Sequence, residues 1–139
     1  LGYQETINFS FVEKEWEIGL HGNPDPIAVL NPIASQLSVM RSSLLGSLLN
    51  VLKYNIDRKV DSVQTFELGR VFMKDPQVQD DLKNVGGFAQ PLRIAGLRHG
   101  QIHPLQWGQP NRVVDFFDAK ADVTSLFDGQ VLNFKPGFC

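Results

Sequence analysis

Two histidines, His99 and His103, have a spacing that could hold a metal ion on a helix. Residues four apart share one helical face, so both imidazoles could reach the same cation. Gly100 and Pro104 argue against a helix here, because glycine and proline interrupt regular structure. No clear third ligand follows. We therefore interpret the pair as loop histidines and assign no metal-binding residue.

Three carboxylates, Asp115, Asp118 and Asp122, stand at the start of a segment with helical apolar spacing. Such a group resembles a catalytic or metal-binding cluster. Acidic residues are also favoured at a helix start, because they cap free backbone N–H groups and interact with the positive end of the helix dipole. We favour the capping interpretation.

No other pattern predicts a catalytic residue. The sequence has neither a Walker-type loop nor a Gly-x-Ser-x-Gly elbow, and no Ser-His-Asp arrangement stands out. Several cations could contact RNA phosphate, since cations position a nucleic-acid backbone without reading its sequence. A solvated charged surface is the favoured interpretation of each. These cations are Arg41, Lys53, Arg58, Lys59, Arg93, Arg98 and Arg112.

Trp107 lies between glycine and proline residues and could contact another subunit, because aromatic residues are enriched at interfaces. A small satellite core beneath the loop is an equal alternative. Glu67 and Arg70 lie three apart on a predicted strand and so face opposite sides, which leaves each in need of another partner, a backbone group or a neighbouring subunit. The candidates for subunit or RNA contact are Arg41, Arg58, Lys59, Arg70 and Trp107.

The composition predicts one globular domain over residues 1–139. Of the 139 residues, 42% are hydrophobic, which is enough for one core and too little for two domains. The net charge of -2 gives no general attraction to nucleic acid. A lone Cys139 excludes an internal disulfide and a multi-cysteine zinc site, and no apolar run reaches the length of a membrane span. We expect a cytoplasmic protein with no membrane partner, and, since the sequence opens at Leu1 without methionine, a fragment of a longer chain.

In the first half of the chain, alternation over residues 6–11 predicts a strand with Ile7, Phe9 and Phe11 on its buried face. Residues 19–31 contain repeated glycine and proline and predict a loop around a short extended piece, residues 27–30. Leucines at helical spacing from Leu44 onward predict the longest helix, ending near Arg58, with Ser42 or Ser43 as its cap.

In the second half, residues 63–73 predict a strand in which Gly69 tolerates a bulge or a close backbone approach. A polar loop, 74–87, joins it to a strand over 92–98, and an irregular stretch, 99–111, precedes a second helix. Asp128-Gly129 turns the chain into a last strand, residues 131–134. The apolar stripes of both helices are predicted to pack in the core; the second consists of Phe116, Ala119, Val123, Leu126 and Phe127. This order predicts an α+β fold with a largely antiparallel sheet.

Four blocks, taken in order, resemble the bacterial phenylalanyl-tRNA synthetase beta subunit family and cover nearly the whole chain. They read LGYQETINFSFV, NPIASQLSVMRSSLLGSLL, FELGRVF and VDFFDAKADVTSLF. The resemblance implies a non-catalytic copy of the class II aminoacyl-tRNA synthetase core, an antiparallel sheet flanked by helices, beside the catalytic core of an alpha subunit. It further implies an alpha2-beta2 heterotetramer that binds tRNA and uses ATP and magnesium.

The resemblance also implies that this copy is inert. Catalytic relatives close the corresponding strand with an arginine that holds ATP phosphate, whereas this sequence has Met73, which offers no charge and no donor. Lys74 is adjacent but points to the opposite strand face. The third class II motif does not appear before Cys139, and the family's acidic magnesium cluster would lie upstream of Leu1. No catalytic, cofactor-binding or metal residue is therefore carried over, and no cofactor is expected in this chain.

Two functions follow from these expectations. The first is a structural, non-catalytic domain of the phenylalanine-tRNA ligase beta subunit, which supports alpha-beta assembly and positions tRNA. The alternative is a stand-alone synthetase-like protein that binds an amino acid or an adenylate, since a fold does not determine a function.

Overall fold

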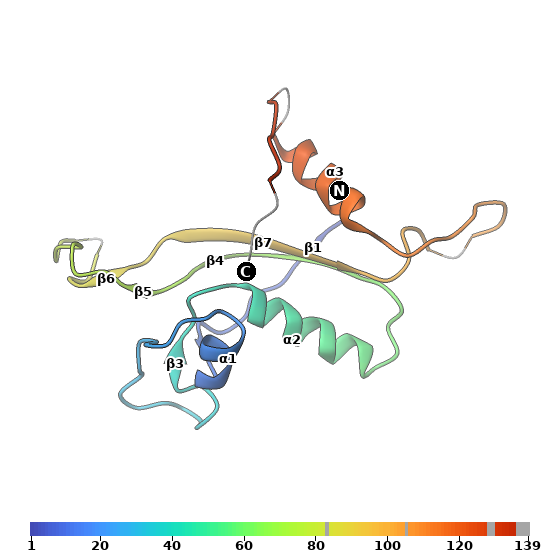
Figure 1. Ribbon diagram of the computed structural model, residues 1–139. Coiled ribbons are helices and arrows are strands. Elements are labelled where there is room, and N and C mark those ends of the chain that lie inside the picture. The colour runs from blue at the N-terminus through green and yellow to red at the C-terminus, as the bar shows by residue number, and fades with distance from the viewer. Residues whose placement is uncertain (83, 105, 128–129, 136–139) are drawn as a thin grey trace.

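The computed structural model describes residues 1–82, 84–104, 106–127 and 130–135. Helices α1 (Lys14–Gly19) and α2 (Leu45–Ile56) lie on one side of the main sheet, and α3 (Phe116–Leu126) lies on the other (Figure 1). The α+β class predicted from the order of elements is confirmed.

The main sheet has the strand order β1-β4-β7. Strands β4 (Val63–Arg70) and β7 (Leu92–His99) pair antiparallel along their whole length, from Val63 opposite His99 to Arg70 opposite Leu92. Strand β1 (Gln4–Glu5) instead runs parallel to β4. The sheet is therefore antiparallel in its long ladder, as predicted, with a short parallel edge.

Two short ladders lie outside the main sheet. Strand β2 (Phe11–Val12) pairs with β3 (Val39–Met40), and β5 (Met73–Lys74) pairs with β6 (Phe88–Ala89). Each has too few residues to show a periodic pattern in the sequence.

The strand predicted over residues 63–73 is confirmed from Val63 to Arg70, and only its predicted continuation to Met73 is wrong. The ladder with β7 ends at Arg70, and the next N–H groups bond elsewhere: Val71 N to Pro91 O, and Phe72 N to Arg41 O. The contact with Arg41 draws the chain toward the start of α2. Gly69 remains inside the ladder, opposite Arg93, without a bulge.

The N-terminal strand prediction fails in its extent and in its faces. The extended strand over residues 6–11 is replaced by two short strands, with Asn8 between them bonded to the Glu67 carboxylate. Ile7 and Phe9, expected in the core, are 91% and 70% exposed. The alternation is real, but its polar face turns inward, because Asn8 supplies donors to a buried carboxylate.

The long helix is confirmed as α2, which begins after Leu44 and ends at Ile56. Leu44 is the cap residue and makes no side-chain cap bond, although Ser43 Oγ accepts from Leu45 N at 3.2 Å. Helix α1 was not predicted. Its six residues are too few for a helical period to appear, and it starts after Glu13, whose backbone is extended.

The predicted C-terminal strand is wrong as well, since the described residues 130–135 contain no strand. Asp128 and Gly129, where a turn was predicted, lie outside the described residues.

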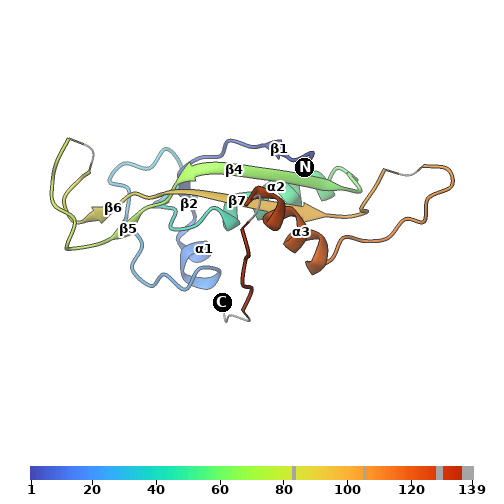
Figure 2. The same ribbon diagram turned by 90° about the horizontal axis from the view of Figure 1, so that it is seen from above.

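The core lies between α2 and the facing side of the main sheet. Among the described residues, the buried apolar side chains are Val39, Leu44, Leu48, Val63 and Val71. Polar side chains are buried beside them: Glu17, Arg41, Ser47, Thr65 and Glu67. Helix α3 contributes no buried residue, so its apolar stripe does not pack as predicted. It lies next to β7 on the other side of the sheet (Figure 2).

Candidate functional site

The interior contains an ion pair between Arg41, which follows β3, and Glu67, in β4. Arg41 Nη1 lies 2.6 Å from Glu67 Oε1, and both side chains are only 3% exposed. The guanidinium also donates to Arg70 O at 3.1 Å, and Asn8 Nδ2 donates to the other carboxylate oxygen at 2.9 Å. A buried charge is costly unless it is paired and hydrogen-bonded, and this network satisfies both requirements.

Gly69 makes room for this pair. A Cβ atom at this position would overlap Arg41 Nη2, so the close approach predicted at Gly69 is that of the arginine side chain. The partner that the sequence left open for Glu67 is therefore Arg41. Because the guanidinium is engaged inside the chain, Arg41 is not positioned to contact RNA at the surface.

The segment at Met73 lies at the end of the sheet where β5 and β6 pair, and Met73 is opposite Ala89. Its neighbouring cations have partners within the chain: Lys74 Nζ lies 2.6 Å from Asp25 Oδ2, and Arg70 Nη1 donates to Gln90 O at 2.7 Å. The partner of Arg70 is therefore a backbone carbonyl group, one of the two kinds of partner that the sequence left open. The Met73 side chain has no charge and no hydrogen-bond donor for a phosphate.

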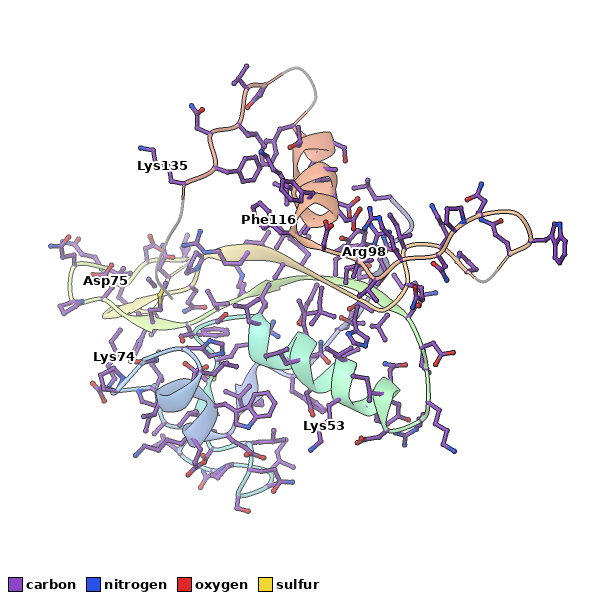
Figure 3. All side chains as sticks on the ribbon, turned by 45° about the vertical axis from the view of Figure 1, so that its right-hand side comes forward. Lys53, Lys74, Asp75, Arg98, Phe116 and Lys135 are labelled. Atoms are coloured by element: carbon purple, nitrogen blue, oxygen red, sulfur yellow. The ribbon has the colours of Figure 1, made fainter. Side chains whose placement is uncertain are left out.

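A separate cleft of about 430 Å³ lies between the C-terminal half of α2 and the sheet. It is remote from Met73 along β4: Lys74 and Asp75 lie at one end of the molecule, and Arg98, which lines the cleft, lies toward the other (Figure 3). Both His99 and His103 line it, together with Thr65, whose buried Oγ1 has no hydrogen-bond partner.

The cleft has the size of a small-molecule site, which is commonly about 300–1,000 Å³. No aspartate or glutamate is among the described residues that line it. It thus offers no counter-charge to the ammonium group of an amino acid. No group of three or more metal-ligating side chains gathers anywhere in the described part of the chain.

The three aspartates of the predicted cluster separate into two arrangements. Asp115 is the N-cap of α3, accepting from Phe117 N and Asp118 N, and Asp118 reaches back to the Asp115 N–H. Arg112 also binds Asp118 with both terminal nitrogens, at 2.6 Å each. The hydrogen bonds from Arg112 and from the Asp115 N–H hold the pKa of the Asp118 carboxyl well below its usual 3.8. The capping interpretation is confirmed for these two residues.

Asp122 instead joins α3 to the sheet. Its Oδ2 accepts from Tyr3 Oη at 2.7 Å and lies 3.0 Å from Arg98 Nη1. Burial, together with the hydrogen bond to Asp122, raises the pKa of Tyr3 to about 12. These contacts link the N-terminus, β7 and α3.

The remaining surface candidates do not converge on one site. Arg58 and Lys59 are exposed after the end of α2, where the Arg58 guanidinium lies 3.3 Å from the centre of the Tyr54 ring. Trp107 is fully exposed in the loop between β7 and α3, so the satellite-core alternative is wrong.

Comparison with known proteins connects this architecture to one family. The family model described as "Phenylalanyl tRNA synthetase beta chain CLM domain" matches residues 1–135. The chain belongs to this family. The resemblance carried by the four sequence blocks is thereby confirmed.

Relatives of the phenylalanyl-tRNA synthetase beta chain family agree over most of this chain. A phenylalanine–tRNA ligase beta subunit from Ralstonia nicotianae is 54% identical over 89% of the chain, and one from Cupriavidus pinatubonensis is 52% identical over 96%. A third, from Bordetella bronchiseptica, is 51% identical over 90%. The chain spans only 15% to 16% of the length of these relatives.

Apolar side chains are exposed on part of the side of the main sheet that faces away from α2, the side on which α3 also lies. Leu68 lies opposite Ile94 in the ladder, and Leu92 is two residues before Ile94, so the three side chains share one face. All three are exposed. We call them the open sheet face. In the described part of the chain, no helix is long and apolar enough to cross a membrane.

Proposed function

We propose that this chain is a structural, non-catalytic domain of a phenylalanine–tRNA ligase beta subunit, with a class II synthetase core-like fold. In this proposal it supports assembly with an alpha subunit into a cytoplasmic alpha2-beta2 enzyme and helps to position tRNA. The alpha subunit activates phenylalanine with ATP and magnesium and attaches it to tRNA. Family membership over residues 1–135 and the names of the relatives support this assignment.

The observation that carries the assembly role is the open sheet face, Leu68, Leu92 and Ile94. Large contiguous exposed apolar patches are rare on monomeric proteins, and they often mark an interaction site. Phe116 and Phe117 of α3 are exposed on the same side of the sheet. A domain with this surface has apolar area to bury against another part of the enzyme.

The non-catalytic role is supported by the chemistry at Met73. Phosphate charge in a transition state is stabilised by fixed donors, best of all by a bidentate arginine. Met73 supplies no donor, and the adjacent Lys74 is paired with Asp25. For tRNA, four exposed cations of the predicted set could contact phosphate, and their effect would be sequence-independent: Lys53, Arg58, Lys59 and Arg93.

The test uses the complete ligase with Met73→Ala in the beta subunit. We expect kcat for phenylalanine attachment, and the rate of ATP–pyrophosphate exchange, to stay within about twofold of the wild type. The reason is that Met73 makes no interaction specific to the transition state, so its removal should not raise the barrier. Met73→Arg, which restores the cation of catalytic relatives, serves as the matched variant and should also leave both rates unchanged. A loss of about a hundredfold in Met73→Ala would contradict the non-catalytic role.

The cleft between α2 and the sheet motivates a test of the alternative, an amino-acid or adenylate binder. Calorimetric titration of the beta subunit alone with phenylalanine, ATP and a non-hydrolysable phenylalanyl-adenylate analogue would detect binding. Because the described lining has no carboxylate for an ammonium group, we expect no heat of binding for phenylalanine or the adenylate analogue. We expect none for ATP either, because Arg98 of the lining is paired with Asp122. Saturable binding that is lost in Thr65→Val would favour the alternative.

A further inference from the structure

The segment between β7 and α3 forms an arm, described over residues 100–104 and 106–114, that extends well beyond the end of the sheet (Figures 1 and 2). Trp107 belongs to this arm and is fully exposed. An indole buries about 150–250 Å² when it is enclosed, so a fully exposed tryptophan is a large unused apolar surface.

The base of the arm is fixed against the rest of the domain. Val114 N donates to Gly100 O, and Ile102 N donates to Arg112 O, each at 2.9 Å. Gln101 N donates to Ser62 Oγ at 3.0 Å. Gly100 has a φ of +94°, and a Cβ atom there would overlap the Asp61 carbonyl oxygen, so glycine permits this close approach.

The part of the arm that leads into α3 is also attached to regular structure. Arg112 binds Asp118 through two hydrogen bonds, and Asp115 caps α3 immediately after the arm ends. Both ends of the arm are thus attached to regular structure, which fixes the base of the arm relative to the sheet. A docking side chain held on such a base loses less conformational freedom when it binds.

The chemistry of the arm indicates the kind of partner. Residues 99–111 contain no Asp, Glu, Lys or Arg, and Arg112 is engaged by Asp118. RNA affinity depends mainly on cations that neutralise phosphate, and this segment offers none. An uncharged surface with a single tryptophan instead matches the core of a protein interface, where charged residues are depleted and tryptophan is enriched.

We propose that Trp107 inserts into an uncharged, apolar pocket of the alpha subunit. This inference rests on the proposed function, because it takes the partner of the domain to be that subunit. It adds a specific point of attachment, the arm, which is separate from the open sheet face.

The first test places a photoreactive residue at position 107 of the arm. A full-length beta subunit carrying Trp107→p-benzoylphenylalanine is assembled with purified alpha subunit and tRNA, irradiated and analysed by mass spectrometry. We expect a covalent product between the beta and alpha subunits. A product with tRNA, a product only within the beta subunit, or no product would each overturn the proposal.

The second test measures alpha-beta affinity with full-length subunits. We expect Trp107→Ala to weaken association about 30-fold, as for a central interface tryptophan, and Trp107→Phe to weaken it less. Leu30→Ala is the matched control, because Leu30 is also an exposed apolar side chain on a loop, and it should have no effect.

The two tests separate the arm from the assembly role. A second variant is a beta subunit from which the segment equivalent to residues 1–135 of this chain has been removed. If Trp107→Ala binds with wild-type affinity while that shortened subunit fails to assemble, the arm proposal alone is overturned. If the subunit without these residues assembles normally, the proposed function is overturned.

Discussion

The ion pair between Arg41 and Glu67 is the main polar contact of the interior, and its environment determines how it affects stability. Both side chains are 3% exposed and are held by further hydrogen bonds. Removing one partner would leave a charge buried without compensation, which costs more than the pair itself contributes.

We therefore expect Arg41→Met to lower the free energy of unfolding by about 3–5 kcal/mol in urea denaturation. The double variant Arg41→Met with Glu67→Leu should lose less than the sum of the two single variants, because it removes both charges. Lys74→Met is the matched control, since its ion pair with Asp25 is exposed and should contribute no more than about 1 kcal/mol. Equal losses for Arg41→Met and Lys74→Met would contradict this description of the core.

The sequence showed which residues carry important chemical groups better than it showed which residues pair with one another. The sequence indicated that Glu67 needed a partner and that Gly69 allowed a close approach. It did not indicate that Arg41 is both the partner of Glu67 and the side chain that approaches Gly69. Arg41 and Glu67 are 26 residues apart in the sequence and come together only in the fold. The separation of Asp122 from Asp115 and Asp118 likewise depends on Tyr3, which lies 119 residues away from Asp122.

At the scale of elements, α3 depends on the charged groups at its start, because none of its residues is buried. The ordinary pKa of an aspartate carboxyl is 3.8, and the pKa of folded Asp118 is lower. A carboxyl with a lowered folded pKa contributes stability that is fully present above the unfolded pKa and is lost as the pH falls through the folded pKa.

Asp118→Asn should therefore destabilise the chain at about pH 7, and its difference from the wild type should shrink as the pH falls below about 4. Urea midpoints of both proteins at several pH values measure this difference. Asp57→Asn, just after the end of α2, makes the same change of charge away from α3 and serves as the control. A gap between Asp118→Asn and the wild type that is the same at about pH 7 and about pH 3 would refute the role given to Asp118.

Long elements were predictable and short ones were not, for a physical reason. The α2 helix and the β4 and β7 strands are long enough for several repeats of their apolar period. Strands of two residues and a helix of six carry no such repeat. At residues 6–11 the period was correct, but a period of two defines two faces without saying which is covered, and Ile7 and Phe9 belong to the uncovered one.

At the scale of the whole molecule, the domain exposes much apolar surface relative to its small buried core. The apolar stripe of α3 was predicted to lie in the core, but its residues are exposed, as are those of the open sheet face. Sequence periodicity detects a face that will be buried, but it does not distinguish burial within the chain from burial against a partner.

Placing a charge on the open sheet face should therefore affect association and not folding. We expect Ile94→Lys in the full-length beta subunit to weaken alpha-subunit binding at least about tenfold, because an unpaired charge would be buried at the interface. The free energy of unfolding of the isolated subunit should change by no more than about 0.5 kcal/mol, as for other exposed positions. Ile33→Lys, on an exposed loop, is the control. Equal binding by all three proteins would remove the sheet face from the interface.

In the proposed function, this domain is needed for assembly of the alpha and beta subunits. We would measure the sedimentation velocity of the alpha subunit mixed with a full-length beta subunit, or with one from which the segment equivalent to residues 1–135 of this chain has been removed. Circular dichroism would verify that the shortened subunit is folded. An alpha-beta complex should form with the full-length subunit, and the alpha subunit should stay free with the folded, shortened one. A complex formed equally well by the shortened subunit would show that the domain is not needed for assembly.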